Sequence, residues 1–462
     1  MKKMSIWQDS VKKINFPKLE ENREVDVLII GGGITGASSF YHLSNTNLKV
    51  MLVEKEKVGM STTSRSTGKL TFMQNDLIDK IRASTSDKDA GKYLASQKEV
   101  LSLIKDIIKK ENINCDLEKV SSTIYTNKEN EIAKIKDLKN FFKQNNIDVT
   151  ETKLSIVDSK YAIKALDTYL FNPVKFVYGL LKDKKNIYED TPILKIEEES
   201  GYYLCYTDKH IIKTHWIIIA SHYPYFNIPF LFPLKGYLEK SYLSASKYQK
   251  DKISLISYSN PFISIRTYKD YLIYLSNSHS ISNDTVDKKN FLELLKKVND
   301  LKLTPEYLWS NIDIMTNDGL PYIGSIKNKM LIATGYNTWG LLSSVLSGKI
   351  LSDIILKKQN NYIEIFSPSR INVNQIIYPF ANLYKNASGY IKGLKQNKQV
   401  KYHLNTMEYK GNLVKRRCPH MKCNLILNEI ENTWDCPCHG SRFTIDGKCI
   451  TSPSNKDINL HK

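Results

Sequence analysis

The sequence has no apolar run that approaches the roughly 18 residues a membrane-spanning helix needs. Residues 1–24 mix charged and aromatic side chains, and they lack the apolar stretch and small-residue cleavage site of a secretory signal peptide. We therefore expect a protein without a membrane span that works in the cytoplasm.

Arginine is scarce, although the chain is strongly basic. Only eight of the 67 Lys and Arg residues are Arg, and with 48 Asp and Glu the formal net charge is +19. Lysine is a strongly hydrated point charge, whereas the planar arginine fork reads phosphates and bases. We therefore interpret the excess of lysine as a solvated basic surface and do not expect nucleic acid as a partner. The alternative is that this surface binds a polyanion.

Cysteine is sparse along most of the chain, which excludes a disulfide-stabilised secreted scaffold. Cys115 and Cys205 stand alone and are expected to be ordinary core thiols. The other five of the seven cysteines lie in the last 45 residues. Because 462 residues suffice for two to three domains, this clustering predicts a separate C-terminal domain.

A glycine-rich turn follows the first β-branched run, residues 25–30. Gly31, Gly33 and Gly36 form G-x-G-x-x-G before a predicted helix, and a second apolar run ends on Glu54. Such glycines allow a tight turn, a close approach to a pyrophosphate and close packing of helix on strand. The spacing predicts a dinucleotide site in which Glu54 holds the ribose hydroxyls.

Three further segments resemble known flavoproteins. The Ser/Thr-rich loop 61–71, and later the segments 318–324 and 333–340, resemble the FAD-dependent oxidoreductases of the D-amino-acid oxidase and glycine oxidase type. The resemblance implies FAD as cofactor, and no Cys or His stands where covalent attachment is expected, so we predict noncovalent FAD. The residues expected to bind FAD are Gly31, Gly33, Ile34, Thr35, Gly36, Glu54, Lys55, Ser64, Arg65, Ser66, Lys69, Gly335, Gly340 and Leu341.

The resemblance also implies the architecture of the chain. We expect an α/β FAD-binding domain of the Rossmann type, similar to glutathione reductase, interleaved with a mixed-sheet substrate domain and followed by a small all-β domain. The expected parts are 20–85, 150–225 and 310–357 for FAD, 86–150 and 226–310 for the substrate, 384–399 as linker and 400–462 as the C-terminal domain.

The C-terminal cysteines come with histidines at fixed spacings. Cys418 and His420 form C-x-H, and after 15 intervening residues Cys436 and His439 form C-x-x-H. A Rieske [2Fe–2S] centre needs two thiolates on one iron and two imidazoles on the other, and these two segments supply that set. A zinc site built from the same residues is the alternative, although zinc loops more often show C-x₂-C spacing.

The remaining features of this region follow from its resemblance to Rieske proteins. Cys423 and Cys438 resemble the pair that a disulfide joins in high-potential Rieske proteins. Phe443 stands where those proteins place a tyrosine that bonds a ligand sulfur, so we predict a lower potential. As a whole, the chain resembles bacterial FAD-dependent oxidoreductases that carry a C-terminal Rieske module.

We hypothesise an enzyme that oxidises a C–N bond of a small amine or amino acid by hydride transfer to FAD. Electrons would then leave through the cluster, to a one-electron acceptor protein or another acceptor such as oxygen. Arg266 is the candidate for a substrate carboxylate, with His279 and Tyr237 as further cavity candidates. The alternatives are a flavoenzyme that modifies nucleic acid, and a redox sensor or electron-transfer protein without an amine substrate.

Overall fold

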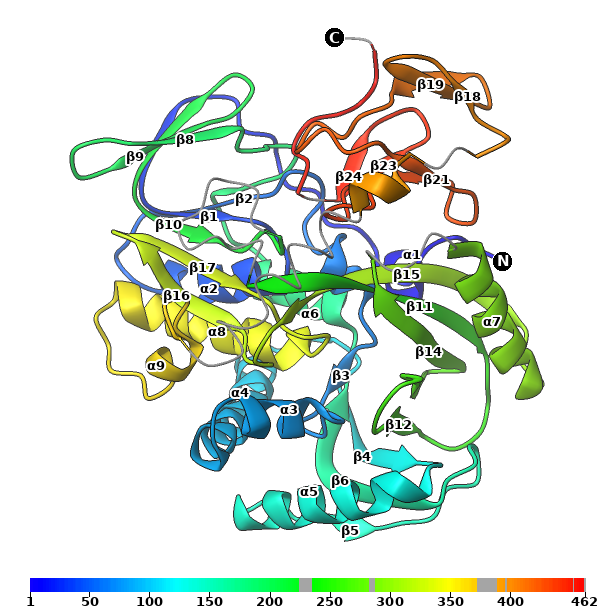
Figure 1. Ribbon diagram of the computed structural model, residues 1–462. Helices are drawn as coiled ribbons and strands as arrows, with labels where there is room; N and C mark the ends of the chain where they lie inside the picture. Colours follow the sequence, from blue (N-terminus) through cyan, green and yellow to red (C-terminus); the bar gives the residue numbers. More distant parts are fainter. Residues whose placement is uncertain (224–234, 282–286, 372–388, 395–396, 452, 461–462) are drawn as a thin grey trace.

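The computed structural model describes residues 1–223, 235–281, 287–371, 389–394, 397–451 and 453–460. Two large sheets form the body of the molecule. The C-terminal residues, orange to red in Figure 1, lie above the region where these two sheets meet. The chain therefore has the three parts that the sequence predicts.

The first sheet has eight strands in the order β16-β17-β10-β1-β2-β7, with β9 and β8 continuing from β10. Its central strands are parallel and largely buried, as expected where helices cover a sheet. The carboxyl ends of β1, β2 and β10 therefore meet at one edge. The strands are β1 (Arg23–Ile30), β2 (Val50–Val53), β7 (Ile187–Tyr188), β8 (Lys195–Glu198), β9 (Tyr203–Tyr206), β10 (Ile211–Ile219), β16 (Tyr322–Lys327) and β17 (Met330–Thr334).

The second sheet has nine strands in the order β15-β11-β14-β13-β12-β4-β6-β3, with β5 beside β6. The β12–β4 pair is parallel and the other pairs are antiparallel, so the sheet is mixed as expected. The strands are β3 (Lys69–Leu70), β4 (Glu118–Thr126), β5 (Thr150–Glu151), β6 (Tyr161–Leu170), β11 (Gly236–Lys247), β12 (Ser254–Ser257), β13 (Ser264–Tyr268), β14 (Tyr271–Ser280) and β15 (Pro305–Thr316).

Helices begin where the sequence offers capping groups. The Ser86 hydroxyl accepts a hydrogen bond from Asp89 N at the start of α4, and the Asn172 side chain caps α6 ahead of Pro173. α2 and α8 pack against each other, and a Cβ at Gly348 of α8 would lie 2.3 Å from the Ser38 hydroxyl. The helices are α1 (Ile6–Asp9), α2 (Ile34–Ser44), α3 (Leu77–Ser84), α4 (Asp87–Lys110), α5 (Ile132–Gln144), α6 (Pro173–Leu181), α7 (Asp287–Asp300), α8 (Gly340–Ile355) and α9 (Ile363–Phe366), with the 3₁₀ helices η1 (Thr62–Arg65) and η2 (Glu129–Glu131).

The C-terminal domain contains two small antiparallel sheets around its own apolar core. Trp434 and Phe443 pair across neighbouring strands and are fully buried in this core. The strands are β18 (Lys401–Tyr402), β19 (Thr406–Tyr409), β20 (Asn412–Lys415), β21 (Ile426–Asn428), β22 (Thr433–Asp435), β23 (Arg442–Thr444) and β24 (Cys449–Thr451).

The strand pairing places parts of the expected FAD ranges in the second sheet. β6 lies within the range 150–225, and residues 310–316 of β15 lie within the range 310–357. Long antiparallel partners draw them there, because β6 pairs along β4 and β15 along β11. Residues 226–234 and 282–286 of the expected substrate part, and 384–388 and 395–396 of the expected linker, lie outside the described residues.

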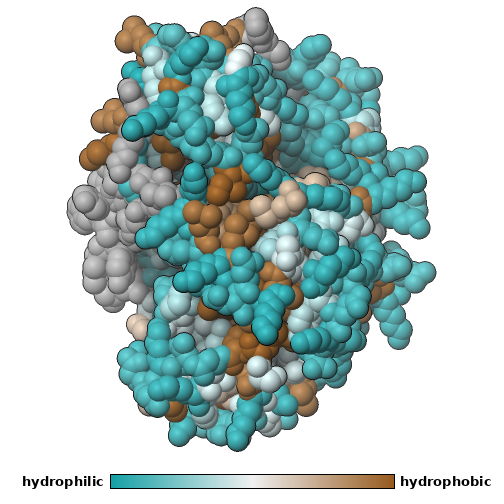
Figure 2. Space-filling model, turned by 90° about the vertical axis from the view of Figure 1, so that its right-hand side faces the viewer, coloured by the Kyte–Doolittle hydropathy of each residue, from teal (hydrophilic) through white to brown (hydrophobic). Residues whose placement is uncertain are grey.

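The surface agrees with the composition. Figure 2 shows one face that is hydrophilic over most of its area, with hydrophobic patches near the middle. Among the described residues, no helix is both long enough and apolar enough to cross a membrane.

Candidate functional site

The glycine-rich turn joins β1 to α2 at the carboxyl edge of the first sheet. Gly31 has a φ of +116°, and a Cβ there would lie 2.6 Å from a backbone oxygen just after β10. A Cβ at Gly36 would lie 1.9 Å from the Gly31 carbonyl oxygen, so the helix reaches the turn only because no side chain intervenes. Gly33 caps α2 without a side chain, and the helix end presents N–H groups and partial positive charge suited to a pyrophosphate.

Glu54 lies directly after β2, beside this turn. Its carboxylate accepts hydrogen bonds from Gly32 N at 2.7 Å and Glu56 N at 2.9 Å. Burial raises the pKa of Glu54. A buried carboxylate at the end of the second strand of this unit is the group that holds ribose hydroxyls in dinucleotide sites.

A cavity of about 360 Å³ extends from this turn between the two sheets. Three residues expected to bind FAD are not among the described residues that line this cavity: Gly36, Ser64 and Gly335. They lie in the turns behind the cavity wall. The other residues expected to bind FAD do line it: Gly31, Gly33, Ile34, Thr35, Glu54, Lys55, Arg65, Ser66, Lys69, Gly340 and Leu341. With the N-termini of α2 and α8 and the buried Glu54, the cavity fits FAD.

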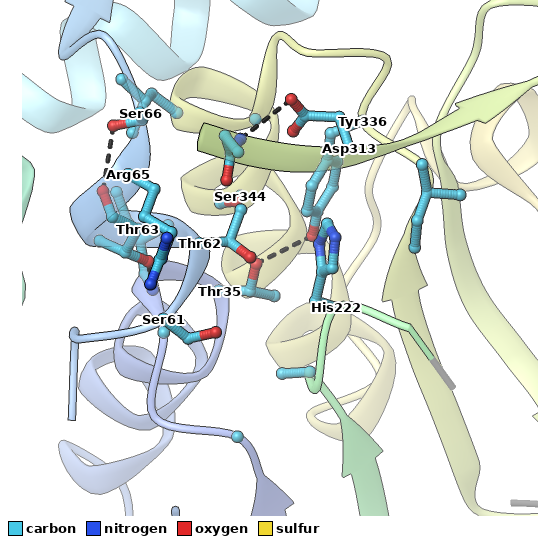
Figure 3. A pocket seen from close by; sticks show the side chains of 18 of the residues that line it. Thr35, Ser61, Thr62, Thr63, Arg65, Ser66, His222, Asp313, Tyr336 and Ser344 are labelled. Atoms are coloured by element: carbon cyan, nitrogen blue, oxygen red, sulfur yellow. Dashed lines mark hydrogen bonds between the residues drawn. The ribbon is translucent and has the colours of Figure 1, made fainter. Parts of the chain in front are cut away.

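Side chains that the sequence did not single out face the same cavity. Figure 3 shows residues of the loop after β2 on one side and His222, Asp313 and Tyr336 on the other. The Tyr336 hydroxyl is hydrogen-bonded to the Thr35 hydroxyl at 2.9 Å and ties α8 to α2. An acid between two isoleucines, Ile312 and Ile314, could have drawn attention to Asp313, whereas nothing local distinguishes His222.

His222 is a buried histidine with one free ring nitrogen. Its Nε2 has no hydrogen-bond partner, and the ring is bonded to the backbone of Ile312. Burial lowers the pKa of His222 to about 4, so the ring is neutral at pH 7. A neutral imidazole whose other nitrogen is engaged presents a hydrogen-bond acceptor to the cavity.

Asp313 is a partly buried acid on β15. It accepts a hydrogen bond from Asn311 Nδ2 at 2.9 Å. Burial is the main cause that raises its pKa to about 7, with the nearby Glu239 contributing. The group therefore changes its charge near neutral pH.

The three residues expected at the substrate lie elsewhere. Arg266 is fully buried and donates to the carbonyl oxygens of Thr67, Gly68, Phe171 and Thr267. It therefore holds the end of the loop 61–71 in place.

His279 and Tyr237 complete that group. His279 Nε2 is hydrogen-bonded to the Tyr242 hydroxyl at 2.9 Å, and neither His279 nor Tyr237 belongs to the described lining of the cavity.

The four expected metal ligands come from two loops of the C-terminal domain. One loop joins β20 to β21 and closes with Cys418 N donating to Cys423 O at 2.8 Å. The other joins β22 to β23 and closes with Cys436 N donating to Ser441 O at 2.7 Å. The Cys418 and Cys436 thiols are hydrogen-bonded to each other, which lowers the pKa of Cys418 to about 7. The fold thus brings two sulfur ligands together from positions 18 residues apart.

The histidines of the two loops show unsatisfied ligand atoms. The His420 and His439 rings lie 5.0 Å apart between centroids, and both Nδ1 atoms are buried without a partner. Burial lowers the pKa of each histidine, to about 4 for His439, so both rings are in the neutral form that binds metal. Two thiols and two orphaned imidazole nitrogens fit a [2Fe–2S] cluster with mixed ligands.

A disulfide joins Cys423 to Cys438 next to these ligands. The Cys436 sulfur lies within 4.8 Å of both disulfide sulfurs. Gly389, before the domain, packs so tightly on this region that a Cβ there would lie 2.6 Å from the Pro437 carbonyl oxygen. The described end of the expected linker is therefore packed against the ligand loops.

Buried charges join the C-terminal domain to the rest of the chain. Arg442 lies 2.6 Å from Glu431 and 3.1 Å from Asp435 within the domain. Lys240 of β11 forms a salt bridge with Asp435 at 3.1 Å, and Arg65 of the loop 61–71 forms one with Glu431 at 3.6 Å. These cations lower the pKa of Glu431 to about 2 despite its burial. We call these five residues the interdomain charge cluster.

The opposite end of the domain covers the cavity beside Glu54. Lys55 Nζ contacts Cys449 Sγ and Ser454 O, each at 3.1 Å. Lys448 pairs with Glu56 at 3.0 Å, and Ile450 of β24 lines the cavity itself. The C-terminal domain is therefore part of the cofactor cavity.

Two matches to known families cover most of the sequence. Residues 26–354 match the FAD dependent oxidoreductase family, and residues 396–462 match the Rieske [2Fe-2S] domain. The second match decides between the cluster and the zinc site in favour of the cluster.

Several known proteins are similar to this chain. The Bacillus subtilis protein YhfW, named as a Rieske 2Fe-2S iron-sulfur protein, is 28% identical over 495 residues, which cover 98% of this chain and 96% of YhfW. Gamma-glutamylputrescine oxidoreductase of Escherichia coli is 21% identical over 368 residues, 74% of this chain and 85% of that protein. The crystal structure of glycine oxidase from Geobacillus kaustophilus superposes with a TM-score of 0.62 at 18% identity, over 76% of this chain and 100% of that one, and this likeness shows the fold.

Proposed function

The chain belongs to the FAD dependent oxidoreductase family and carries a Rieske [2Fe-2S] domain, and from this premise we propose that it oxidises a C–N bond of a small amine or amino acid. When bound, FAD supplies a hydride acceptor and the cluster a one-electron carrier. The observation that carries the proposal is the cavity. His222 and Asp313 face the Ser/Thr-rich loop 61–71 across it, and Ile450 of the C-terminal domain lines it.

His222 and Asp313 orient the amine in this proposal. The free Nε2 of His222 accepts an N–H hydrogen bond from the substrate nitrogen. The Asp313 carboxylate attracts the substrate ammonium and takes up a proton from it, because its pKa of about 7 suits proton exchange near neutral pH. The substrate nitrogen would then carry the lone pair that favours loss of hydride from the adjacent carbon.

Within the substrate class, the cavity favours an amine without a carboxylate. The cations along the described lining already have partners: Lys55 contacts Ser454 O, Lys57 pairs with Glu189, Arg65 contacts Ser310 O and Lys69 donates to Leu255 O. A buried carboxylate needs a cation as its partner, and these cations are already engaged. The lining is therefore poorly suited to the carboxylate of an amino acid. The likeness to gamma-glutamylputrescine oxidoreductase, which is named for an amine, supports an amine nitrogen as the reacting group.

An anaerobic reduction assay tests the proposal. The purified protein, with flavin, iron and sulfide quantified, is mixed with a panel of primary and secondary amines and of amino acids, and flavin bleaching is followed. We expect bleaching by amines, faster than by the matching amino acids, followed by the EPR signal of a reduced cluster. Bleaching by a nicotinamide or a protein donor alone, with none from either panel, would favour the sensor alternative and refute the proposal.

A further inference from the structure

One short turn touches both cofactor sites. Ser221, His222 and Tyr223 follow β10, and His222 lines the FAD cavity. The Tyr223 ring lies 6.1 Å from the His439 ring and 6.5 Å from the His420 ring, between centroids. Neighbouring residues of one turn therefore face the flavin site and the two histidine ligands.

The backbone conformation of the turn separates these two side chains. His222 has a φ of +65°, in the left-handed region that is uncommon for residues other than glycine. The Thr334 hydroxyl donates to the His222 carbonyl oxygen, and the ring is bonded to the Ile312 backbone, so β17 and β15 both hold the turn. Such a conformation persists only where the surroundings fix it, which is typical of functional positions.

Tyr223 is also supported from the second sheet. It packs against a small apolar cluster formed by Leu238, Ile312 and Ile314. The ligand loop touches the same cluster, because a Cβ at Gly440 would lie 3.3 Å from side-chain carbons of Leu238 and Ile312. The Tyr223 ring is thus held between the flavin domain and the ligand loop.

We propose that Tyr223 is a positioning residue for electron transfer, and that electrons cross from flavin to cluster over this turn. The inference rests on the proposed function, namely that the cluster accepts the flavin electrons. With both groups bound, the two flavin electrons would cross one at a time, each reducing one Fe³⁺ to Fe²⁺, and the flavin protons would pass to water over the two steps. A one-electron acceptor must reoxidise the cluster before the second electron crosses. Tyr223 acts by fixing the two imidazoles against the protein face that lines the flavin cavity.

The test measures transfer within the full-length protein loaded with both cofactors. A light flash with oxalate as sacrificial donor reduces the bound flavin without oxygen, and reoxidation of the flavin by the cluster is then followed by absorbance and by EPR of rapidly frozen samples. The variants are Tyr223→Leu, which removes the ring, and Tyr223→Phe, which keeps it. Tyr390→Leu is the matched control, because Tyr390 also lies by the ligand loops but bonds Met421 O on an exposed side.

We expect Tyr223→Leu to slow transfer by about tenfold, which is the lower end of the cost of changing groups that contact metal ligands. Its EPR g values should also shift at unchanged iron content, whereas Tyr223→Phe should restore both rate and spectrum and Tyr390→Leu should leave the rate as in the wild type. Wild-type rates in Tyr223→Leu, or an equal loss in Tyr390→Leu, would overturn this inference alone. If the wild-type flavin never reduces the cluster, the electron route of the proposed function fails as well.

Discussion

The two cofactor sites differ in how much of the chain each one needs. The cluster ligands lie within residues 418–439, on two loops that close with their own backbone hydrogen bonds. The lining of the flavin cavity runs from Gln8 to Ile450 and takes residues from both large sheets and the C-terminal domain. The first site is local and the second is assembled by the tertiary fold, so substitutions should affect them in different ways.

The largest effect should come from a ligand of the local site. Cys436→Ser removes one of two thiolates, so we expect complete loss of the reduced EPR signal and of acid-labile sulfide, with flavin content retained. Cys449→Ser is the control, because Cys449 is a buried free thiol of the same domain outside the ligand set. Loss of the cluster in both variants would show that the domain core, and not the ligand, had been tested.

The next largest effect should come from a substitution in the interdomain charge cluster, which joins the C-terminal domain to the rest of the chain. Arg442→Met leaves Glu431 and Asp435 with fewer partners in a buried place, so we expect a loss of about 3 to 5 kcal/mol in the free energy of unfolding. Urea unfolding measures it. Lys401→Met, which breaks an exposed pair with Glu408, should cost less than about 1 kcal/mol. Equal losses would mean that the interdomain charge cluster contributes no more than a surface pair.

Within the assembled site, Glu54 should govern FAD affinity. Glu54→Gln replaces charged hydrogen bonds to the ribose by neutral ones, so we expect about tenfold weaker binding of FAD. Titration of apoprotein with FAD, followed by flavin fluorescence, measures this. Glu24→Gln, an exposed substitution on β1, is the control and should bind FAD as the wild type does.

The pH profile of flavin reduction should report Asp313. Its raised pKa of about 7 means that the carboxyl is protonated and neutral below that pH and negative above it. The rate of flavin reduction by a cationic amine should therefore increase as the pH rises through 7, and this increase should be weaker in Asp313→Asn. If the rate increases equally in the variant, the increase comes from deprotonation of the amine itself.

The smallest effect should be a change in the cluster potential. Phe443 is fully buried in the domain core, and Phe443→Tyr adds one hydroxyl close to the ligand loops. If this hydroxyl donates to a ligand sulfur, it stabilises the reduced cluster and raises the midpoint potential, which redox titration by EPR measures. An unchanged potential with an intact cluster would show that the hydroxyl does not reach the sulfur.

The same contrast explains what the sequence predicted. The predicted ligands Cys418, His420, Cys436 and His439, and the turn with Gly31 and Glu54, are recognised by short spacings, so pattern reasoning could propose them.

Arg266, His279 and Tyr237 were chosen for their residue type. Where a strand directs such a side chain depends on its pairing partners, which the sequence does not state. His222 was missed for the converse reason. Its place in the cavity depends on a backbone conformation that β15 and β17 stabilise from distant parts of the chain.

The contribution of Ile450 to the cavity has a consequence for biosynthesis. A ribosome releases the glycine turn and Glu54 long before Ile450, a residue of the C-terminal domain that lines the same cavity. The C-terminal domain must therefore be made and folded before the FAD cavity has its full lining, so folding of this domain and retention of the flavin are coupled steps of assembly.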